Sequence, residues 1–599
     1  MIDLEQGSGR TGPRKKLDPL MLTESSPPVT NRGSWPVTLL ASALAVSAVI
    51  CGSIVQSTLA NPWLNVLLVI ALLLPVLRGE IRQQTGWLQQ YYEIYRRALL
   101  VAGLGWALVT AVSYLVSIRP YVGSVDLFYY LCNARDMNQQ ALASNNAYSY
   151  FPGVYTFWKT VLGIAGENFT AIQRSYLPVI VINILLVGAI VWQHSRSLAA
   201  SLFAGTWFLV LISRFQANAA ETELLATIPL LLTVLCWAGR PLQGRRGWAN
   251  SLLLGVGLGL TLFMKQQAGL LSLGALAMLA GFRWRNRSDQ HQWAPLLVVP
   301  FLAAGTFLLA VLAVGEGWNP LQIGLATVGQ YAREGSWGFN LYVQIRRDET
   351  AALAGLLSGF ALVACFRRQP SDSRENMARL EVILFLAIGA LATLWQLRSR
   401  AYHHYMLLAA PGLVITAVLL WIEHFPARDE SRRSTGLTRC ALILLIFVPF
   451  LRDAGMRESF TVWRIPRPHN FAPDLPWHQQ AVVARDLARL QQDLPAQASL
   501  YTVPHRHNSV YFILQARSSS PAGYRFQQAP IDQTDWSLHQ RVLLLKPMSW
   551  DESDRQVISV KQLTQVQETL LQAGFQKQLD LPTMVLYEQG SQAIKPSTH

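Results

Sequence analysis

Long apolar runs separated by short polar gaps dominate the chain from about residue 36 to residue 452. Runs of about 15 to 22 residues are typical of α-helices that satisfy their own backbone hydrogen bonds in lipid. The pattern therefore predicts an all-α polytopic membrane bundle of about 13 transmembrane helices. The predicted spans are 36–56, 62–77, 98–118, 175–193, 197–213, 223–239, 249–264, 268–282, 293–314, 351–366, 380–397, 402–421 and 437–452.

The two ends of the chain have a different pattern. Residues 1–35 are polar and rich in Pro, Ser and Gly, which predicts a disordered tail. Beyond residue 453 the charge density is that of a soluble domain, and helical patterns alternate with short apolar strands. This alternation predicts a C-terminal α/β domain over residues 453–599. The predicted helices are 477–494, 508–516 and 561–574, and the predicted strands are 499–503, 541–546 and 581–587.

Composition supports a membrane protein and sets its orientation. Hydrophobic residues make up 51% of the chain and charged residues only 14%, whereas a soluble protein carries roughly a quarter. The net charge of +15 does not indicate nucleic acid, because many basic residues lie in alternate short loops rather than on one soluble face. The positive-inside rule then places the N-terminus in the cytoplasm. With an odd number of spans, the C-terminal domain is extracytoplasmic, and we expect a multi-pass protein of a cell membrane such as the bacterial inner membrane.

Two long loops, 119–174 and 315–350, fall on the same predicted exterior side. In the first loop, Asp126, Tyr130 and Asn133 are spaced to share one helix face, although Asp126 alone would also suit a helix start. An aromatic segment around Tyr148 follows, with a predicted turn at residues 151–153. It would line a binding mouth or simply form an interfacial aromatic belt.

Acidic and basic residues also gather at this predicted surface. Glu221 and Glu223 precede a span, where they would offset the helix dipole or serve chemistry. Lys265 lies between the short segments 249–264 and 268–282, which form either a tight helical hairpin or a pair that stops short of the interface. A cationic rim follows at Arg398, Arg400, His403 and His404, for which interfacial snorkelling is the alternative.

Opposite charges at one membrane surface suit the transfer of a sugar from a lipid phosphate. Arg or Lys would neutralise the phosphate as its bond to the sugar breaks. A carboxylate would accept the proton of the incoming hydroxyl, which is typically worth about 10²–10⁴ in rate. The helix bundle would hold the lipid tail of the donor.

The order of these motifs resembles the GT-C superfamily of membrane glycosyltransferases, especially the branch with lipid A aminoarabinose transferase and protein O-mannosyltransferases. The similar segments are DLFYYLCNARDM (126–137), NAYSYFPGVY (146–155), GVGLGLTLFMKQQAGLL (255–271) and AYHHYMLLAAPGLVI (401–415). The chain departs from the family where Leu127 follows Asp126, because many members have paired acids there. It also has Ala401-Tyr402 in place of Arg-Tyr, with Arg400 one position earlier.

The resemblance implies an inverting glycosyltransferase, a hexosyl- or pentosyltransferase, that uses a polyprenyl-phosphate sugar donor. It makes Asp126 the catalytic base, assisted by Glu221 or Glu223, and leaves open whether these acids hold a divalent cation. The implied substrate- and phosphate-binding residues are Lys265, Arg400, His403, His404, Tyr148 and Arg135. The sugar, the acceptor and the oligomeric state stay open. Alternative interpretations are a lipid-linked glycan transporter or flippase, a non-catalytic membrane scaffold, and an O-antigen ligase or polymerase.

Overall fold

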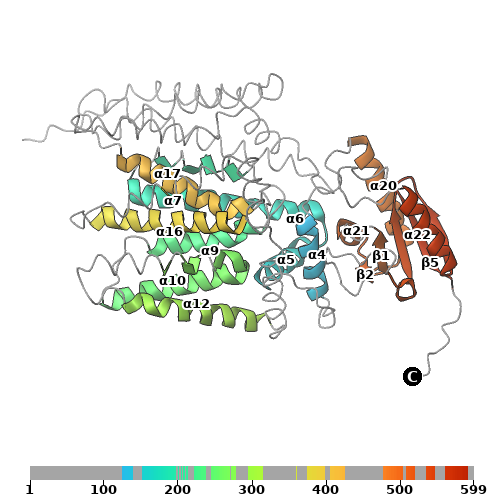
Figure 1. Cartoon of the computed structure of the whole chain (residues 1–599), viewed down its shortest axis with the longest axis horizontal. Coiled ribbons are helices and arrows are strands. Elements are labelled where there is room, and N and C mark those ends of the chain that lie inside the picture. The colour runs from blue at the N-terminus through green and yellow to red at the C-terminus, as the bar shows by residue number, and fades with distance from the viewer. Residues whose placement is uncertain are drawn as a thin grey trace, which may run out of the picture.

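Figure 1 shows the computed structural model of the chain, in which parallel helices lie at one end and an α/β domain at the other. The structure describes residues 125–138, 152–196, 222–237, 244–269, 294–314, 374–397, 405–424, 477–503, 508–519, 534–546 and 560–590, together with residue 359 and parts of 200–212 and 272–277. The predicted spans 36–56, 62–77, 98–118 and 437–452, and the loop 315–350, lie outside these residues.

Among the described residues, six helices pack side by side as a bundle (Figure 1). Helix α10 contacts α9 and α12, α16 contacts α17, and α7 contacts both α9 and α17. The six helices are α7 (Leu177–Ser195), α9 (Glu223–Trp237), α10 (Gly244–Met264), α12 (Ala294–Ala313), α16 (Arg374–Leu397) and α17 (Met406–His424).

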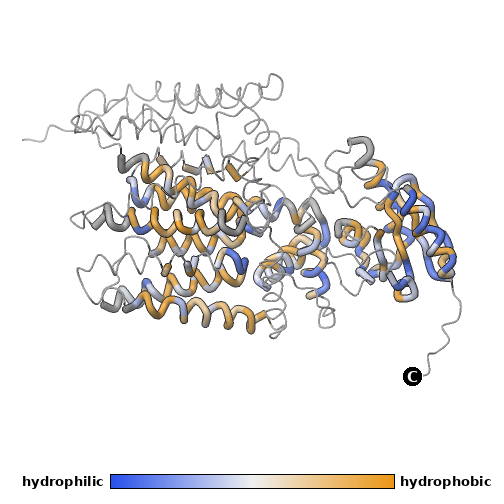
Figure 2. Tube along the Cα trace, in the orientation of Figure 1, coloured by the Kyte–Doolittle hydropathy of each residue, from blue (hydrophilic) through white to orange (hydrophobic). Residues whose placement is uncertain are grey.

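The bundle helices are apolar along most of their length, as the hydropathy colouring in Figure 2 shows. In the described part of the chain, three stretches are long and apolar enough to cross a membrane: Leu177–Ser195, Gly247–Met264 and Pro295–Ala313. Helix α12 leaves Leu297, Phe301 and Leu309 exposed, as expected of a helix that faces lipid. These helices support a polytopic membrane protein, and their bounds follow the corresponding predicted spans closely.

Three further helices come from the predicted first exterior loop and lie at one end of the bundle (Figure 1). They are α4 (Val125–Asn138), α5 (Pro152–Ala165) and α6 (Phe169–Ser175). The predicted turn at residues 151–153 was wrong, because Pro152 and Gly153 begin helix α5. Proline suits this position, since the first turn of a helix needs no bond from its missing N–H.

The C-terminal domain is built on a five-stranded mixed sheet with strand order β2-β1-β3-β5-β4. Strand β1 pairs in parallel with β2 and β3, while β5 runs antiparallel to both β3 and β4. The elements are α20 (Trp477–Asp493), β1 (Ser499–Val503), α21 (Asn508–Ile513), β2 (Arg517–Ser518), the 3₁₀ turn η5 (Trp536–Leu538), β3 (Arg541–Leu545), α22 (Val560–Gln572), β4 (Phe575–Asp580) and β5 (Met584–Gln589).

Apolar strands and amphipathic helices explain how this domain holds together. Strands β1 and β3 are almost wholly buried, and α22 places Val566 and Leu570 against the sheet. The Asp486 carboxylate on α20 accepts hydrogen bonds from the amide and hydroxyl of Thr583, which ties this helix to the turn before β5. One hydrophobic core continues from the bundle through α4 into α20 and α21, so the domain is packed onto the rest of the molecule.

Candidate active site

Lys265 lies at the apex of a tight helical hairpin. Its amide donates to the carbonyl of Thr261, and its own carbonyl accepts from the amide of Gly269, so helical bonding continues on both sides. In a straight helix Gly269 would lie roughly 10 Å along the axis from Leu262. Instead, a Cβ built on Gly269 would lie 2.5 Å from the Leu262 Cα, so the chain folds back sharply. Both alternatives predicted for this segment require the chain to turn back at this point.

The Lys265 side chain joins three helix ends. Its ammonium forms an ion pair with Glu223, the first residue of α9, and donates to the Thr222 hydroxyl at 2.9 Å. The same ammonium lies 5.6 Å from the ring centroid of Tyr405, directly before α17, in a cation–π contact. Lys265 is 2% exposed and Glu223 0%. Charges this deeply buried are costly to keep and commonly mark a site with a function.

A buried amide follows Lys265 in the hairpin. Gln266 is 1% exposed, and among the residues that the structure describes neither its amide nitrogen nor its amide oxygen has a hydrogen-bond partner. Such a group usually costs about 1–3 kcal/mol of stability. A hairpin that keeps both a buried ammonium and a buried amide therefore offers polar groups that a bound polar ligand would satisfy.

A second polar network fixes α9 just beyond Glu223. The Asn183 amide on α7 donates to the carbonyls of Val179 and Leu224, both at 2.9 Å. Its oxygen accepts from the Thr227 hydroxyl at 2.6 Å. These bonds join α7 to α9 across the bundle core, within about one helical turn of Glu223.

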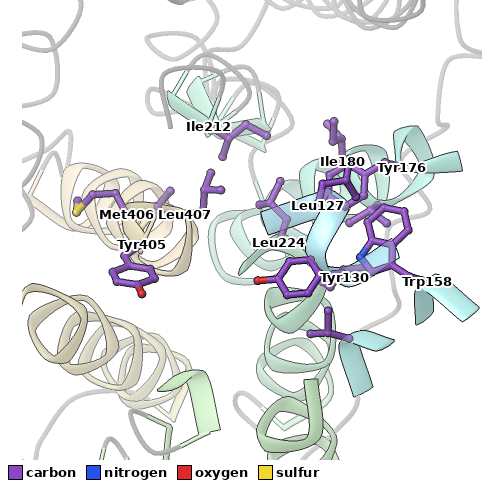
Figure 3. Close-up of a cluster of buried hydrophobic side chains, with 14 of the residues drawn as sticks. Leu127, Tyr130, Trp158, Tyr176, Ile180, Ile212, Leu224, Tyr405, Met406 and Leu407 are labelled. Carbon is purple, nitrogen blue, oxygen red and sulfur yellow. The ribbon is translucent and has the colours of Figure 1, made fainter. Parts of the chain in front are cut away.

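Aromatic side chains from α4 and α5 surround the neighbouring region. Tyr130 and Tyr155 make an edge contact with ring centroids 6.0 Å apart, and Trp158 stacks on Tyr176 at the same distance. Figure 3 shows the Tyr130 ring beside Leu224, with its hydroxyl directed towards the side where Tyr405 lies.

Helix α5 is held directly against the end of α10. A Cβ on Gly153 would lie 2.5 Å from the Phe263 carbonyl oxygen, so the close approach depends on glycine. This contact brings the aromatic segment next to the hairpin that carries Lys265, two residues beyond Phe263.

The structure describes some of the predicted site residues and not others. It brings Glu223 and Lys265 into contact, and it places the backbone of Asp126 in the first turn of α4. Arg135, near the other end of α4, instead bonds to the C-terminal domain. Outside the described residues lie Tyr148, Glu221, Arg400, His403 and His404.

The resemblance left open whether Asp126, Glu221 and Glu223 hold a divalent cation. The structure describes neither Glu221 nor the side chain of Asp126, and within the described residues no group of three or more His, Cys, Asp or Glu side chains could hold a metal ion. Glu223, one of the three acids considered, forms an ion pair with Lys265.

Cys132 on α4 lies in the same buried core as Tyr130 and Tyr155, but it is a poor nucleophile. Burial raises the pKa of its thiol to about 12, a shift that nearby Arg135 only partly opposes. The thiol is therefore protonated at neutral pH, whereas nucleophilic cysteines have a lowered pKa.

Sequence reasoning missed Thr222, Tyr405 and Gln266 as members of this cluster. Each is next to a residue that was singled out: Thr222 precedes Glu223, Gln266 follows Lys265, and Tyr405 follows His404. A neutral side chain gives little signal by itself in an apolar sequence. A usable signal was the crowding of polar residues at the ends of the apolar runs.

Comparisons with protein-family models and with curated protein sequences find no match. Among solved structures, the chain is similar to two of ArnT from Cupriavidus metallidurans. The structure described as bound to undecaprenyl phosphate has 13% sequence identity and a TM-score of 0.45. The apo structure has 14% identity and a TM-score of 0.46. In both comparisons the similarity covers 82% of this chain and 98% of the other.

Proposed function

We propose that this chain is an integral membrane glycosyltransferase of the GT-C type. It moves a sugar from a polyprenyl-phosphate carrier to a hydroxyl of an extracytoplasmic acceptor, with inversion at the anomeric carbon. The observation that carries the proposal is the buried contact between Lys265 and Glu223 at the junction of three helix ends. An ammonium held in an apolar bundle, at the end of membrane-length helices, suits a phosphate attached to a lipid.

The proposed donor site is centred on the Lys265 hairpin. The phosphate of the donor takes Glu223's place as the main partner of the Lys265 ammonium, while the Thr222 hydroxyl and the Gln266 amide offer further polar contacts. The predicted cations Arg400, His403 and His404 are close to Tyr405 in sequence and would add positive charge. The apolar helices of the bundle would accommodate the prenyl chain.

The proposed sugar and acceptor site lies on the side of α4 and α5. Tyr130 and Tyr155 supply aromatic faces and edges next to the hairpin, and the predicted residue Tyr148 precedes α5 by a few positions. Aromatic rings with a polar hydroxyl suit a ligand that is apolar on one face and polar at its rim.

The proposed chemistry is a single displacement. The acceptor hydroxyl oxygen attacks the anomeric carbon while its proton passes to the Asp126 carboxylate. The bond from the anomeric carbon to the phosphate oxygen breaks, and its electron pair leaves with the polyprenyl phosphate. Lys265 stabilises the negative charge that develops on this leaving group. Glu223 holds Lys265 in place before the donor binds.

The first test is Asp126→Asn in purified protein with a synthetic polyprenyl-phosphate sugar. We expect transfer to fall about 10²–10⁴-fold, since the base is lost, with donor binding retained. Asp493→Asn, at the exposed end of α20, is the matched control and should transfer at the wild-type rate. Full transfer by Asp126→Asn would remove the base assignment, whereas a non-catalytic scaffold would show no transfer even as the wild-type protein.

The second test addresses the donor phosphate. We expect the double variant Glu223→Gln, Lys265→Met to bind a polyprenyl phosphate at least about tenfold more weakly, because a charge-assisted contact is lost. Lys561→Met, on the exposed face of α22, controls for the loss of a lysine. Unchanged binding would contradict the phosphate role. Movement of intact donor across a liposome membrane, without transfer, would instead identify a flippase.

A further inference from the structure

Helix α4 is fastened to the C-terminal domain by one buried arginine. The Arg135 guanidinium donates through Nη1 to the carbonyl of Tyr511 at 3.3 Å and through Nη2 to the carbonyl of Ala516 at 2.5 Å. Arg135 is 4% exposed. About two turns earlier on α4, the ring of Phe128 packs on Phe512, with centroids 6.0 Å apart. The contact therefore combines charge-assisted hydrogen bonds with aromatic packing.

The acceptors of these bonds are firmly held within the C-terminal domain. The Tyr511 carbonyl also accepts the amide of Ala516, at the point where α21 ends, so the guanidinium caps this helix end. The Tyr511 hydroxyl accepts the amide of Thr502 on β1 at 2.9 Å. The amide of Arg517 then bonds to Ala498 as β2 begins beside β1. Arg135 is thus bonded to the sheet of the domain through a short, rigid path.

The same helix carries Asp126 near its first turn. Residues 126 and 135 are nine positions apart, so their backbones are separated by about 14 Å along the axis. A helix of this length moves as one body, and a shift at Arg135 therefore moves Asp126. The opposite end of α4 is where the proposed reaction takes place.

We propose that Arg135 is a positioning residue, through which the C-terminal domain holds α4 so that Asp126 is placed for proton transfer. This inference rests on the proposed function and gives the domain a part in catalysis. It also replaces the substrate contact that sequence resemblance implied for Arg135, since the guanidinium is directed to backbone carbonyls of the domain. Against α5, helix α4 packs through aromatic contacts of Tyr129 and Tyr130 with Tyr155, so the hydrogen bonds of Arg135 add a contact of a different kind.

Two variants on opposite sides of the contact test the inference in the full-length protein. Arg135→Ala removes the guanidinium, and Phe512→Ala removes the ring on the domain side. We expect each to lower kcat about 10–100-fold, because small displacements of a catalytic group are costly, while donor KM stays within about twofold. Combining them should add little, since both break one contact. Arg135→Lys should recover part of the rate. Arg489→Ala, an exposed arginine on α20, should leave kcat unchanged.

Hydrogen exchange of the peptide 125–138 supplies a readout that does not depend on sugar transfer. We expect both alanine variants to speed exchange along the whole of α4, including its Asp126 end. The inference is overturned if Phe512→Ala leaves both kcat and α4 exchange at wild-type values, or if Arg135→Ala acts by raising donor KM. If wild-type protein transfers no sugar, the proposed function fails. The exchange measurement still decides whether the domain holds α4.

Discussion

The bundle and the C-terminal domain place their charged pairs in opposite surroundings. In the domain, Lys577 and Asp580 form an ion pair at 3.0 Å with both side chains about half exposed, and Lys546 reaches the same carboxylate at 2.7 Å. In the bundle, Lys265 and Glu223 pair in complete burial. Exposed pairs contribute about 0–1 kcal/mol and are readily replaced. A buried pair must overcome the cost of removing two charges from water, so its presence in an apolar bundle points to chemistry rather than to stability.

The largest expected effect comes from removing one partner of the buried pair. Lys265→Met leaves the Glu223 carboxylate buried without its main counter-charge, at a cost of about 3–5 kcal/mol. The double variant Glu223→Gln, Lys265→Met leaves no uncompensated charge and should unfold close to the wild-type temperature. Apparent Tm of the purified proteins in one detergent measures both. Equal destabilisation by the single and double variants would show that the two charges are not coupled.

A smaller effect is expected at the neutral polar network of the bundle. Asn183→Leu removes the hydrogen bonds to the Leu224 carbonyl and from the Thr227 hydroxyl. Hydrogen bonds between membrane helices are worth about 0.6 kcal/mol each on average, so we expect a total loss of roughly 1–2 kcal/mol. Apparent Tm again measures this. If polyprenyl phosphate binding also weakens, Asn183 helps to orient Glu223; Thr233→Val, on the same α9 helix, is the control.

The C-terminal domain should respond to pH through His539. Burial lowers the pKa of this imidazole below its ordinary value, although Asp535 opposes the shift, and Ser519 Oγ lies 2.8 Å from Nδ1. Because the folded state favours neutral His539, this histidine contributes to the free energy of unfolding. The contribution is complete above the ordinary histidine pKa of about 6.5 and is lost as pH falls towards the lowered pKa.

Hydrogen exchange of strand β3 in the full chain, corrected for the intrinsic rate at each pH, measures this dependence. His539→Asn should lose it, while His478→Asn on α20 should keep it. This expectation is contradicted if the hydrogen-exchange protection of β3 in the wild-type protein is the same at pH 7 and at about pH 5.

The smallest effect is expected for an exposed pair of the domain. Lys577→Ala removes one of the two lysines that pair with the Asp580 carboxylate, and Lys546 still neutralises that carboxylate. We expect a loss below about 0.5 kcal/mol, reduced further by salt. Exchange of the β4–β5 peptide at low and high ionic strength measures it. A loss as large as that of Lys265→Met would remove the contrast between the two regions.

Sequence reasoning reached the bundle and part of the site because both leave a strong compositional signal. The apolar runs predicted α7, α9 and α12 to within a few residues. Charges at the ends of such runs stand out, so the sequence singled out both Glu223 and Lys265, which the structure brings together.

Other features leave little signal in the sequence. Strand β4 (FQKQLD) is an exposed edge strand of mostly polar residues, and the predicted strands did not include it. The partners of Arg135 are backbone carbonyls, which any residue supplies, and they lie in a different domain. Pro152 and Gly153 favour a turn by composition, yet proline also suits a helix start and glycine the close approach of Phe263. Tertiary contacts decided these cases.

The bonds from Arg135 join residues 376 and 381 positions apart along the chain. At synthesis rates of about 5–20 residues per second, α4 leaves the ribosome roughly 20–80 s before its acceptors do. Until then, the helix that bears Asp126 can pack against α5 but lacks its bonds to the C-terminal domain. A prematurely terminated copy would lack the fastening altogether, so under the proposed function the order of translation would itself slow sugar transfer by unfinished molecules.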